Sequence, residues 1–249
     1  MTIRRIVIVG ATSLIAQHCS RIWINGGVEE LILVGRNKIK TERVAKDLSV
    51  RNSKTRISVY DIDFTDPLAI NALVEDIFST GVISTVLIAH GILSDQSILQ
   101  SDLGAVNHNL LINGVSPILF SEAFVTKMLN LNYGTISIIG SVAGDRGRKS
   151  NYIYGSAKAM IATYCQGLQH RLAGSGVKAI IIKPGPTETP MTFHLQGGRI
   201  RLAPVNLVAL DIVSGIHKGV PVVYTPKRWS FIMFIMRHIP NFIFNRLDI

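Results

Sequence analysis

Short apolar runs recur along the chain, and several of them are continuous rather than alternating. Continuous apolar runs are typical of parallel strands that are covered on both faces. We expect strands over residues 5–10, 30–35, 56–63, 84–91, 135–141, 178–185 and 220–226. Helix-length segments lie between the runs, among them 14–26, 66–79, 115–130 and 154–174. This alternation predicts an α/β chain with a doubly wound parallel sheet and helices on both faces.

We expect a single domain over residues 1–249, because no Pro/Ser-rich linker, charge run, internal repeat or low-complexity segment divides the sequence. The two cysteines, Cys19 and Cys165, are too few and too far apart for a disulfide framework or a metal site. A reducing compartment is therefore the simpler expectation, and we predict a cytoplasmic protein without a bound metal. The first apolar run is too short for a signal-peptide core, which agrees with that location.

The charge balance is strongly basic, with 26 Lys and Arg against 16 Asp and Glu, a net charge of +10. Such a balance favours anionic partners, namely nucleotide phosphates, anionic lipid or nucleic acid. Charge alone does not choose among them. Since no aromatic-rich basic face or nucleic-acid motif is evident, we expect no nucleic-acid partner.

Residues that follow the first two predicted strands are candidates for binding a nucleotide, because ligands of this fold class lie beyond the carboxyl ends of the strands. Gly10 permits a tight turn, and Thr12 and Ser13 place hydroxyls beside a helix N-terminus that favours phosphate. An ordinary capped turn would have the same sequence. After the second strand, Arg36, supported by Asn37 and Lys38, would accommodate a ribose 2′-phosphate, which points to NADP(H). A solvated basic loop would have the same sequence.

The third predicted strand ends in a group of carboxylates. A hard-cation site needs several oxygen ligands, and we expect no such site here. Asp66 precedes Pro67 and is expected to cap a helix. Asp63 is better placed to contact an adenine amino group.

The segment 150–160 contains Tyr154 and, four residues later, Lys158, so the two share one face of a helix. A neighbouring ammonium favours the phenolate, and this predicts a lowered pKa for Tyr154 and a role in acid/base chemistry. Tyr152 has no lysine at that spacing. Ser141 ends the fifth strand and is a candidate for orienting a carbonyl. Asn113 is a polar residue within an apolar helical pattern, either a satisfied buried amide or part of a proton relay.

Taken in order, these residues resemble the short-chain dehydrogenase/reductase family over essentially the whole chain. The matching features are the turn at Gly10, "DF" at 63–64, "AHG" at 89–91, Asn113, Ser141, Tyr154, Lys158 and "PGPTET" at 184–189. The resemblance implies a Rossmann-like fold and an NADP(H)-dependent oxidoreductase. It also implies cofactor contacts from Gly10, Thr12, Ser13, Leu14, Ile15, Arg36, Asn37, Asp63, Phe64, Ala89, His90, Gly91, Tyr154, Lys158, Pro184, Thr187 and Thr189.

The same resemblance implies a catalytic tetrad. Tyr154 would donate the proton in ketone reduction, and Lys158 would lower its pKa and bind the nicotinamide ribose. Ser141 would position the carbonyl, and Asn113 would hold a water between Lys158 and solvent. One departure concerns Leu14, which stands where the family usually has a glycine, so the pyrophosphate would approach past a larger side chain.

A narrower resemblance is to the branch related to decaprenylphosphoryl 2-keto-erythro-pentose reductases, through "GATSLIAQ", "LIAHG" and "SVAGDRGRKSNYIYGSAKA". It implies reduction of a keto sugar carried on a polyprenyl phosphate, in cell-envelope glycan synthesis. We also expect a homo-oligomer and a partner oxidase that supplies the keto sugar. The alternatives are a reductase of soluble carbonyl compounds and a cofactor-binding regulatory protein.

The C-terminal tail, residues 227–249, has an apolar run at 229–236 that is too short to span a bilayer. Lys227, Arg228, Arg237 and Arg246 lie around it, so the tail would suit the surface of an anionic membrane at its inner face. Packing on the core or across a dimer interface would suit the apolar residues equally well. Residues 186–202, with "GGR" at 197–199, are expected to form a mobile lid over the substrate.

Overall fold

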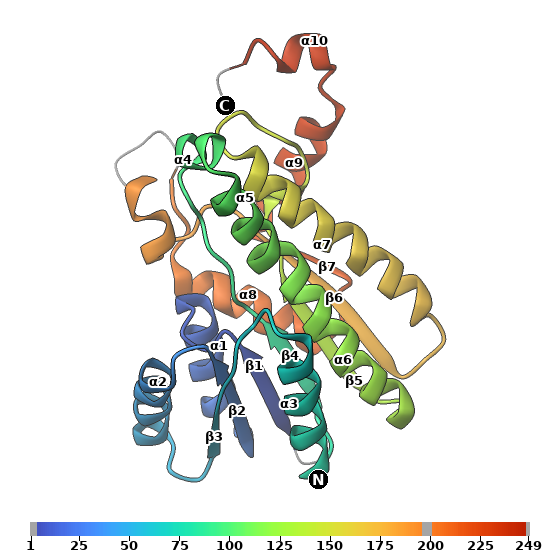
Figure 1. The fold of residues 1–249 in the computed structure, drawn as a ribbon. Helices are drawn as coiled ribbons and strands as arrows, with labels where there is room; N and C mark the ends of the chain where they lie inside the picture. Colours follow the sequence, from blue (N-terminus) through green and yellow to red (C-terminus); the bar gives the residue numbers. More distant parts are fainter. Residues whose placement is uncertain (1–3, 196–200, 248–249) are drawn as a thin grey trace.

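The computed structural model of the chain describes residues 4–195 and 201–247. Within these ranges, seven parallel strands form a sheet in the order β3-β2-β1-β4-β5-β6-β7 (Figure 1). The strands are β1 (Arg5–Val9), β2 (Glu30–Gly35), β3 (Arg56–Asp61), β4 (Thr85–Ile88), β5 (Gly134–Ile139), β6 (Val177–Pro184) and β7 (Val222–Thr225). Each lies in one of the predicted runs or overlaps it, so the doubly wound parallel sheet is confirmed.

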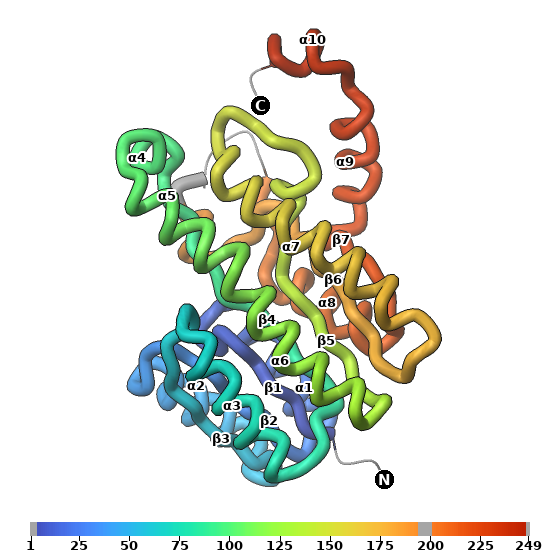
Figure 2. The backbone as a smooth tube through the Cα atoms, turned by 45° about the vertical axis from the view of Figure 1, so that its right-hand side comes forward, coloured from blue at the N-terminus to red at the C-terminus, as the bar shows by residue number. Residues whose placement is uncertain are grey.

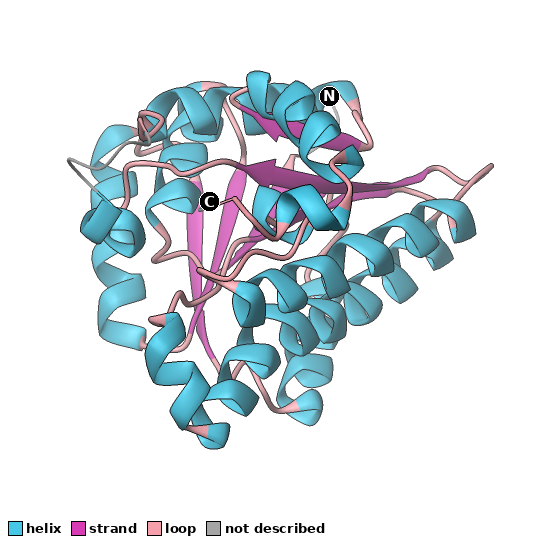
Figure 3. Cartoon of the chain, turned by 90° about the horizontal axis from the view of Figure 1, so that it is seen from above, coloured by secondary structure: helices cyan, strands magenta, loops and turns pink. Residues whose placement is uncertain are grey.

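Helices cover both faces of this sheet, as Figure 3 shows from above. They are α1 (Leu14–Asn25), α2 (Lys38–Arg51), α3 (Pro67–Ser79), α4 (Gln96–Ser101), α5 (Leu103–Leu110), α6 (Ser116–Leu131), α7 (Tyr152–Arg171), α8 (Val205–Lys218), α9 (Arg228–His238) and α10 (Asn241–Phe244). Shorter turns are η1 (Leu111–Val115), η2 (Val142–Gly144) and η3 (Pro190–Leu195). One apolar core joins the sheet to α3, α6 and α7, and a second joins it to α1, α2 and α8.

Most of the strands end before their predicted apolar runs do. The residues between the end of such a strand and the end of its run lie at the carboxyl edge of the sheet. The predicted run 84–91 is a strand only as far as Ile88, which pairs with Val9 at the end of β1. Residues 89–91 continue beyond the sheet. The chain order of the neighbours reverses between β1 and β4, and the crevice at such a reversal is where ligands bind in open α/β sheets.

Two loop residues that follow strands cap the next helices. The Asn37 side chain accepts a hydrogen bond from Lys40 N (2.9 Å) at the start of α2. The Asp66 side chain accepts one from Leu68 N (2.8 Å) at the start of α3, with Pro67 in the first turn. The predicted cap at Asp66 is thus confirmed, and both caps satisfy amides that the helix itself leaves unpaired.

The turn η2 packs directly against the backbone of α7. A Cβ at Gly144 would lie 2.6 Å from the carbonyl carbon of Lys158, and one at Gly155 would lie 2.9 Å from Ala143 O. Such distances exclude any side chain at these two positions without movement of the backbone. The end of β5 is therefore held close to the first two turns of α7.

The C-terminal helices α9 and α10 extend from the body of the fold, as Figures 1 and 2 show from two directions. Arg146, in the loop before α7, attaches them: its guanidinium donates to Arg237 O (3.2 Å), Ile239 O (3.2 Å) and Asn241 Oδ1 (2.7 Å). Met233 is the buried residue of α9. In the part of the chain that the structure describes, no helix is long and apolar enough to cross a membrane.

Candidate active site

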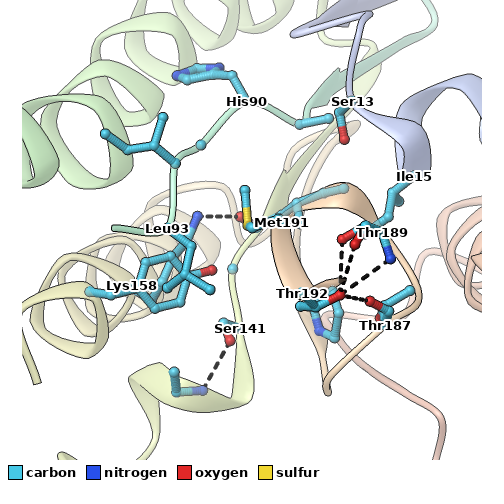
Figure 4. A pocket seen from close by; sticks show the side chains of 18 of the residues that line it. Ser13, Ile15, His90, Leu93, Ser141, Lys158, Thr187, Thr189, Met191 and Thr192 are labelled. Atoms are coloured by element: carbon cyan, nitrogen blue, oxygen red, sulfur yellow. Dashed lines mark hydrogen bonds between the residues drawn. The ribbon is translucent and has the colours of Figure 1, made fainter. Parts of the chain in front are cut away.

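A cavity of about 430 Å³ lies at the carboxyl ends of β1, β4, β5 and β6. Figure 4 shows Lys158 and Ser141 on one side of it and Ser13, Ile15 and Thr189 on the other. Most of the predicted site residues line this cavity. They are Gly10, Thr12, Ser13, Leu14, Ile15, Arg36, Phe64, Ala89, His90, Gly91, Ser141, Tyr154, Lys158, Pro184, Thr187 and Thr189.

The turn after β1 brings its backbone unusually close to the loop after β4. Gly10 has a φ of +82°, and a Cβ there would lie 2.6 Å from His90 N. Only glycine suits this position, since other residues are strained at positive φ and the space is filled. Ser13 begins α1 without using its side chain as a cap, so its hydroxyl is available to a ligand beside the free amides of the helix.

Three predicted contacts do not line the cavity. Asn37 caps α2, and Asp63 is exposed with its carboxylate accepting hydrogen bonds from Thr65 N (2.8 Å) and Thr65 Oγ1 (2.7 Å). Asn113 is buried behind the wall. The contacts expected of Asn37 and Asp63 with a cofactor stay predictions.

Tyr154, Ser141 and Lys158 converge on one wall because the first two turns of α7 pack on the end of β5. Lys158 Nζ lies 5.6 Å from the centroid of the Tyr154 ring and donates to Ile139 O (3.1 Å). Ser141 Oγ accepts a hydrogen bond from Ala143 N (3.1 Å), and the Ser141 hydroxyl lies close enough to Tyr154 to affect the pKa of the phenol. The shared helix face inferred from the spacing of Tyr154 and Lys158 is confirmed.

The expected lowering of the Tyr154 pKa is wrong for this structure. Burial raises the pKa of Tyr154 to about 12, against a smaller lowering by the Ser141 hydroxyl. Burial also lowers the pKa of Lys158 to about 8. The sequence spacing identified the pair, but the low polarity around both groups disfavours each charged form, and this effect exceeds the attraction that the spacing suggested.

The buried ammonium of Lys158 predicts a stability effect with a defined pH window. Its pKa falls from an ordinary 10.5 to about 8, so the unfolded chain binds this proton more tightly than the folded chain does. Each pKa unit corresponds to ~1.4 kcal/mol. Allowing for the lost hydrogen bond to Ile139 O, Lys158→Met should raise the free energy of unfolding at pH 7 by about 1 to 3 kcal/mol. Urea denaturation at pH 7 measures this.

The gain in the free energy of unfolding of Lys158→Met should shrink as the pH rises from about 8 to 10.5. Over this range the wild-type lysine loses its proton first in the folded and then in the unfolded chain, so it no longer opposes folding. The exposed Lys54 provides the control: Lys54→Met should change stability little at any of these pH values. A Lys158→Met protein that is less stable than the wild type at pH 7, or a gain independent of pH, would contradict this interpretation.

The side chain of Asn113 binds the loop after β4 and does not line the cavity. Its Oδ1 accepts from Ile92 N (2.9 Å), and its Nδ2 donates to Ile92 O (2.9 Å) and Asn109 Oδ1 (3.0 Å). It lies in η1, a π-helical turn between α5 and α6. The side chain is a satisfied buried amide, one of the two alternatives, and the water relay stays a prediction.

The imidazole of His90 points away from the cavity, as Figure 4 shows, and only the backbone side of the residue faces it. Ser116 Oγ donates to Phe64 O (2.6 Å), so it accepts from His90 Nε2, 2.9 Å away. This assigns the proton of the neutral ring to Nε2. Burial, together with the nearby charges of Lys158 and Arg36, lowers the pKa of His90 to about 3 and keeps the ring neutral.

The loop after β6 closes the other side of the cavity through a set of threonines. Thr187 Oγ1 donates to Gly185 O (2.9 Å), and Thr192 Oγ1 donates to Thr187 O. Thr187 also bridges to Ala203, which joins the two ends of the predicted lid. Residues 196–200, with the "GGR" motif, lie outside the described residues.

Sequence reasoning missed several lining residues, mostly apolar or loop positions without a chemical signature. They are Ile92, Leu93, Ile112, Ile139, Gly140, Val142, Ala143, Arg148, Asn151 and Gly185, whereas Pro186, Pro190, Met191 and Thr192 lie in the predicted lid, residues 186–202. Arg148 had a usable signal, since it is a basic residue between Ser141 and Tyr154 in the sequence.

Comparisons with known proteins agree with this arrangement. A sequence model described as short chain dehydrogenase matches residues 4–198. An uncharacterized oxidoreductase of Streptomyces coelicolor is 29% identical over 247 residues, which cover 98% of this chain and 96% of that protein. A short-chain dehydrogenase from Sphingobium yanoikuyae in complex with NADPH has a TM-score of 0.82 at 20% identity, covering 96% and 97% of the two chains. A bulky-bulky ketone specific alcohol dehydrogenase from Comamonas testosteroni has a TM-score of 0.80 at 21% identity, covering 97% and 96%.

Proposed function

Because the chain belongs to the short chain dehydrogenase family, we propose that it reduces a ketone to an alcohol with NADPH as the reductant. The observation that carries the proposal is the convergence of Tyr154, Ser141 and Lys158 on one wall of the cavity. The opposite wall has the tight turn at Gly10 and a helix N-terminus, which suits a nucleotide. The NADPH complex of the Sphingobium protein and the ketone specificity of the Comamonas protein support the same reaction.

The residues of the cavity fit NADP(H). Ser13 and the first amides of α1 would bind the pyrophosphate, and Arg36 would bind the 2′-phosphate. Leu14 and Ile15 also line this wall, so the pyrophosphate would contact larger side chains than glycine. When bound, the nicotinamide supplies a hydride to the substrate carbonyl carbon.

The side chains of the protein would orient the ketone and donate one proton to it. Ser141 Oγ and Tyr154 Oη would bind the carbonyl oxygen together, since both residues line the same cavity and the Ser141 hydroxyl lowers the pKa of Tyr154. A pKa of about 12 keeps Tyr154 protonated at neutral pH, and the developing alkoxide is basic enough to take that proton. Lys158, charged below about pH 8, would stabilise the phenolate that remains.

For the substrate, we favour a keto sugar carried on a polyprenyl phosphate. The sequence resemblance supports this choice, and so does the position of the tail: Arg146, which holds α9 and α10, is five residues after Ser141. Trp229 of α9 packs on Gly185 of the cavity lining, since a Cβ at Gly185 would overlap the indole. A lipid at the exposed tail would thus lie near the cavity. The partner oxidase and the homo-oligomer stay predictions.

The test is to follow NADPH oxidation with a panel of polyprenyl-phosphate keto sugars and soluble ketones at matched concentrations. We expect reduction of the lipid-linked keto sugars with the highest kcat/KM. Higher values for soluble ketones would favour the alternative, a reductase of soluble carbonyl compounds. Binding of NADPH without turnover of any ketone would favour a regulatory protein.

The tail itself predicts contact with an anionic bilayer surface. Several of its apolar side chains are exposed, among them Phe231 (67%) and Phe242 (69%), although Met233 is buried and Trp229 packs on Gly185. Each basic residue near anionic lipid contributes about 1 kcal/mol of attraction, so the contact should be reversible and salt-dependent. In liposome flotation, the wild type should float with anionic vesicles, and the double variant Lys227→Glu/Arg228→Glu should float much less, as should Arg237→Glu.

A matched control is the double variant Arg43→Glu/Lys46→Glu, which makes the same charge change on exposed residues of α2. It should float like the wild type. If the folded wild type never floats, or if all variants float equally at every salt concentration, contact of the tail with a membrane is excluded, and packing or a dimer contact becomes the better interpretation of its apolar residues.

A further inference from the structure

The cavity wall is unusually rich in cations. Arg36, Arg148 and Lys158 line it, and no Asp or Glu is among the described residues that do so. Two of these cations are accounted for by the proposed function: Arg36 by the 2′-phosphate, and Lys158 by the phenol of Tyr154. Arg148 has no part in that reaction, although a guanidinium always carries a charge that needs a partner when it leaves water.

Within the described residues, Arg148 makes no ion pair, and no side chain or carbonyl accepts a hydrogen bond from its guanidinium. Its Nε is buried without any hydrogen-bond partner. Burial lowers the pKa of the guanidinium, which reflects the same poor solvation. An unpaired cation that is partly withdrawn from water is destabilising, so its presence in a cavity calls for a ligand that completes it.

The neighbouring residues cannot serve as this partner. Asp145, three residues earlier, is buried and already engaged on both oxygens: Lys183 Nζ donates to Oδ1 (2.5 Å), and Tyr224 Oη donates to Oδ2 (2.7 Å). Arg146 shows the contrast, because its guanidinium is occupied by the acceptors of the tail and lies 4.3 Å from the Phe244 ring centroid. The loop thus contains one satisfied arginine and one unsatisfied arginine.

A second polar group without a hydrogen-bond partner lies close to Arg148 in the chain. Asn151 also lines the cavity, and its Oδ1 is buried without a partner. It precedes α7 but does not cap the helix with its side chain. Asn151 N donates to Arg148 O (3.1 Å), so one turn of the backbone holds both residues just before Tyr154.

We propose that Arg148 binds an oxyanion of the substrate, a phosphate or a carboxylate, and that Asn151 accepts a hydrogen bond from a neighbouring substrate hydroxyl. The guanidinium fork matches the paired oxygens of either anion. The inference rests on the proposed ketone reduction, because it assigns the anion to the molecule whose carbonyl meets Ser141 and Tyr154. Arg148 lies between these two residues in the sequence, and it lines the same cavity.

The experiment measures binding to the full chain saturated with NADPH, by isothermal titration, with three compounds that share one carbon chain: geraniol, geranic acid and geranyl phosphate. The wild type should bind one or both anions at least about 10-fold more tightly than the alcohol, the range expected for a charged hydrogen-bonded pair. Arg148→Met should abolish the preference, and Arg148→Lys should retain part of it. The control Arg43→Met, on the surface of α2, should bind like the wild type.

Three results would overturn the proposal. The first is a preference for an anion that persists in Arg148→Met. The second is an Arg148→Met protein that binds NADPH more weakly and keeps the preference, which would assign Arg148 to the cofactor. The third is inorganic phosphate that binds as tightly as geranyl phosphate, which would show that the site does not recognise the organic part of the substrate. Ketone turnover reports separately on the reaction. A wild type that prefers the anions but reduces no ketone contradicts the proposed function alone, whereas one that reduces ketones without an Arg148-dependent preference contradicts the anion site alone.

Discussion

Tyr154→Phe is expected to lower kcat by at least about 100-fold, the usual contribution of a positioned proton donor, while Tyr152→Phe has little effect. The first change removes only the phenolic hydroxyl, and it leaves the ring in place beside Lys158. Tyr152 lies two residues earlier in the same helix and is 42% exposed, outside the cavity lining. Steady-state reduction of the best ketone of the panel measures both variants.

The pair of variants is its own control, because each removes one phenolic oxygen from the first turn of α7. Circular dichroism and NADPH binding should match the wild type in both. Equal losses of kcat in the two variants would show that the effect comes from the helix rather than from the proton of Tyr154, and the assignment would fail.

Arg36→Ala is expected to weaken NADPH binding by roughly 10- to 100-fold and to change NADH binding little, because a charge-assisted hydrogen bond contributes about 1.5–3 kcal/mol. The two cofactors differ only in the 2′-phosphate, so the ratio of their dissociation constants isolates that group. Arg36 is exposed at the rim of the cavity, directly after β2, where its charge can meet the phosphate. Fluorescence titration of both cofactors gives the ratio.

Arg43→Ala removes the same charge from the following helix, α2, without touching the cavity, and it should leave both dissociation constants unchanged. Asn37→Ala is unsuitable as a control because Asn37 caps α2, so its loss would combine cofactor and stability effects. If Arg36→Ala weakens NADPH and NADH equally, the choice of cofactor does not come from this residue.

The fold and the catalytic pair could be predicted from the sequence because both depend on local periodicity. Continuous apolar runs such as 30–35 are strands buried on both faces, and β2 is buried at every residue. Tyr154 and Lys158 lie on one face of α7 because a spacing of four residues is set by the local period of the helix. Asn113 was foreseen as a polar residue in a helix, but its hydrogen bonds to Ile92 join segments 21 residues apart, which no local pattern contains.

The electrostatics could not be predicted, because they depend on what surrounds each group. The four-residue spacing of Tyr154 and Lys158 indicates attraction, whereas the direction of the pKa of Tyr154 is set by burial. Arg148 is a similar case: in the sequence it is one basic residue among several, and only the structure reveals that Asp145 is already engaged elsewhere. The position of the tail was equally ambiguous in the sequence, since the same apolar residues would suit either a membrane surface or a packed interface.

The central claim is that the cavity reduces a ketone with NADPH through Tyr154, and the most direct measurement follows NADPH consumption and alcohol formation together. The wild type, incubated with NADPH and the ketone panel, should consume NADPH and form alcohol in equal amounts for at least one ketone. Tyr154→Phe should bind NADPH normally and form almost none. Alcohol formation by Tyr154→Phe at the wild-type rate, or a wild type that binds NADPH but reduces no ketone in the panel, would contradict the account.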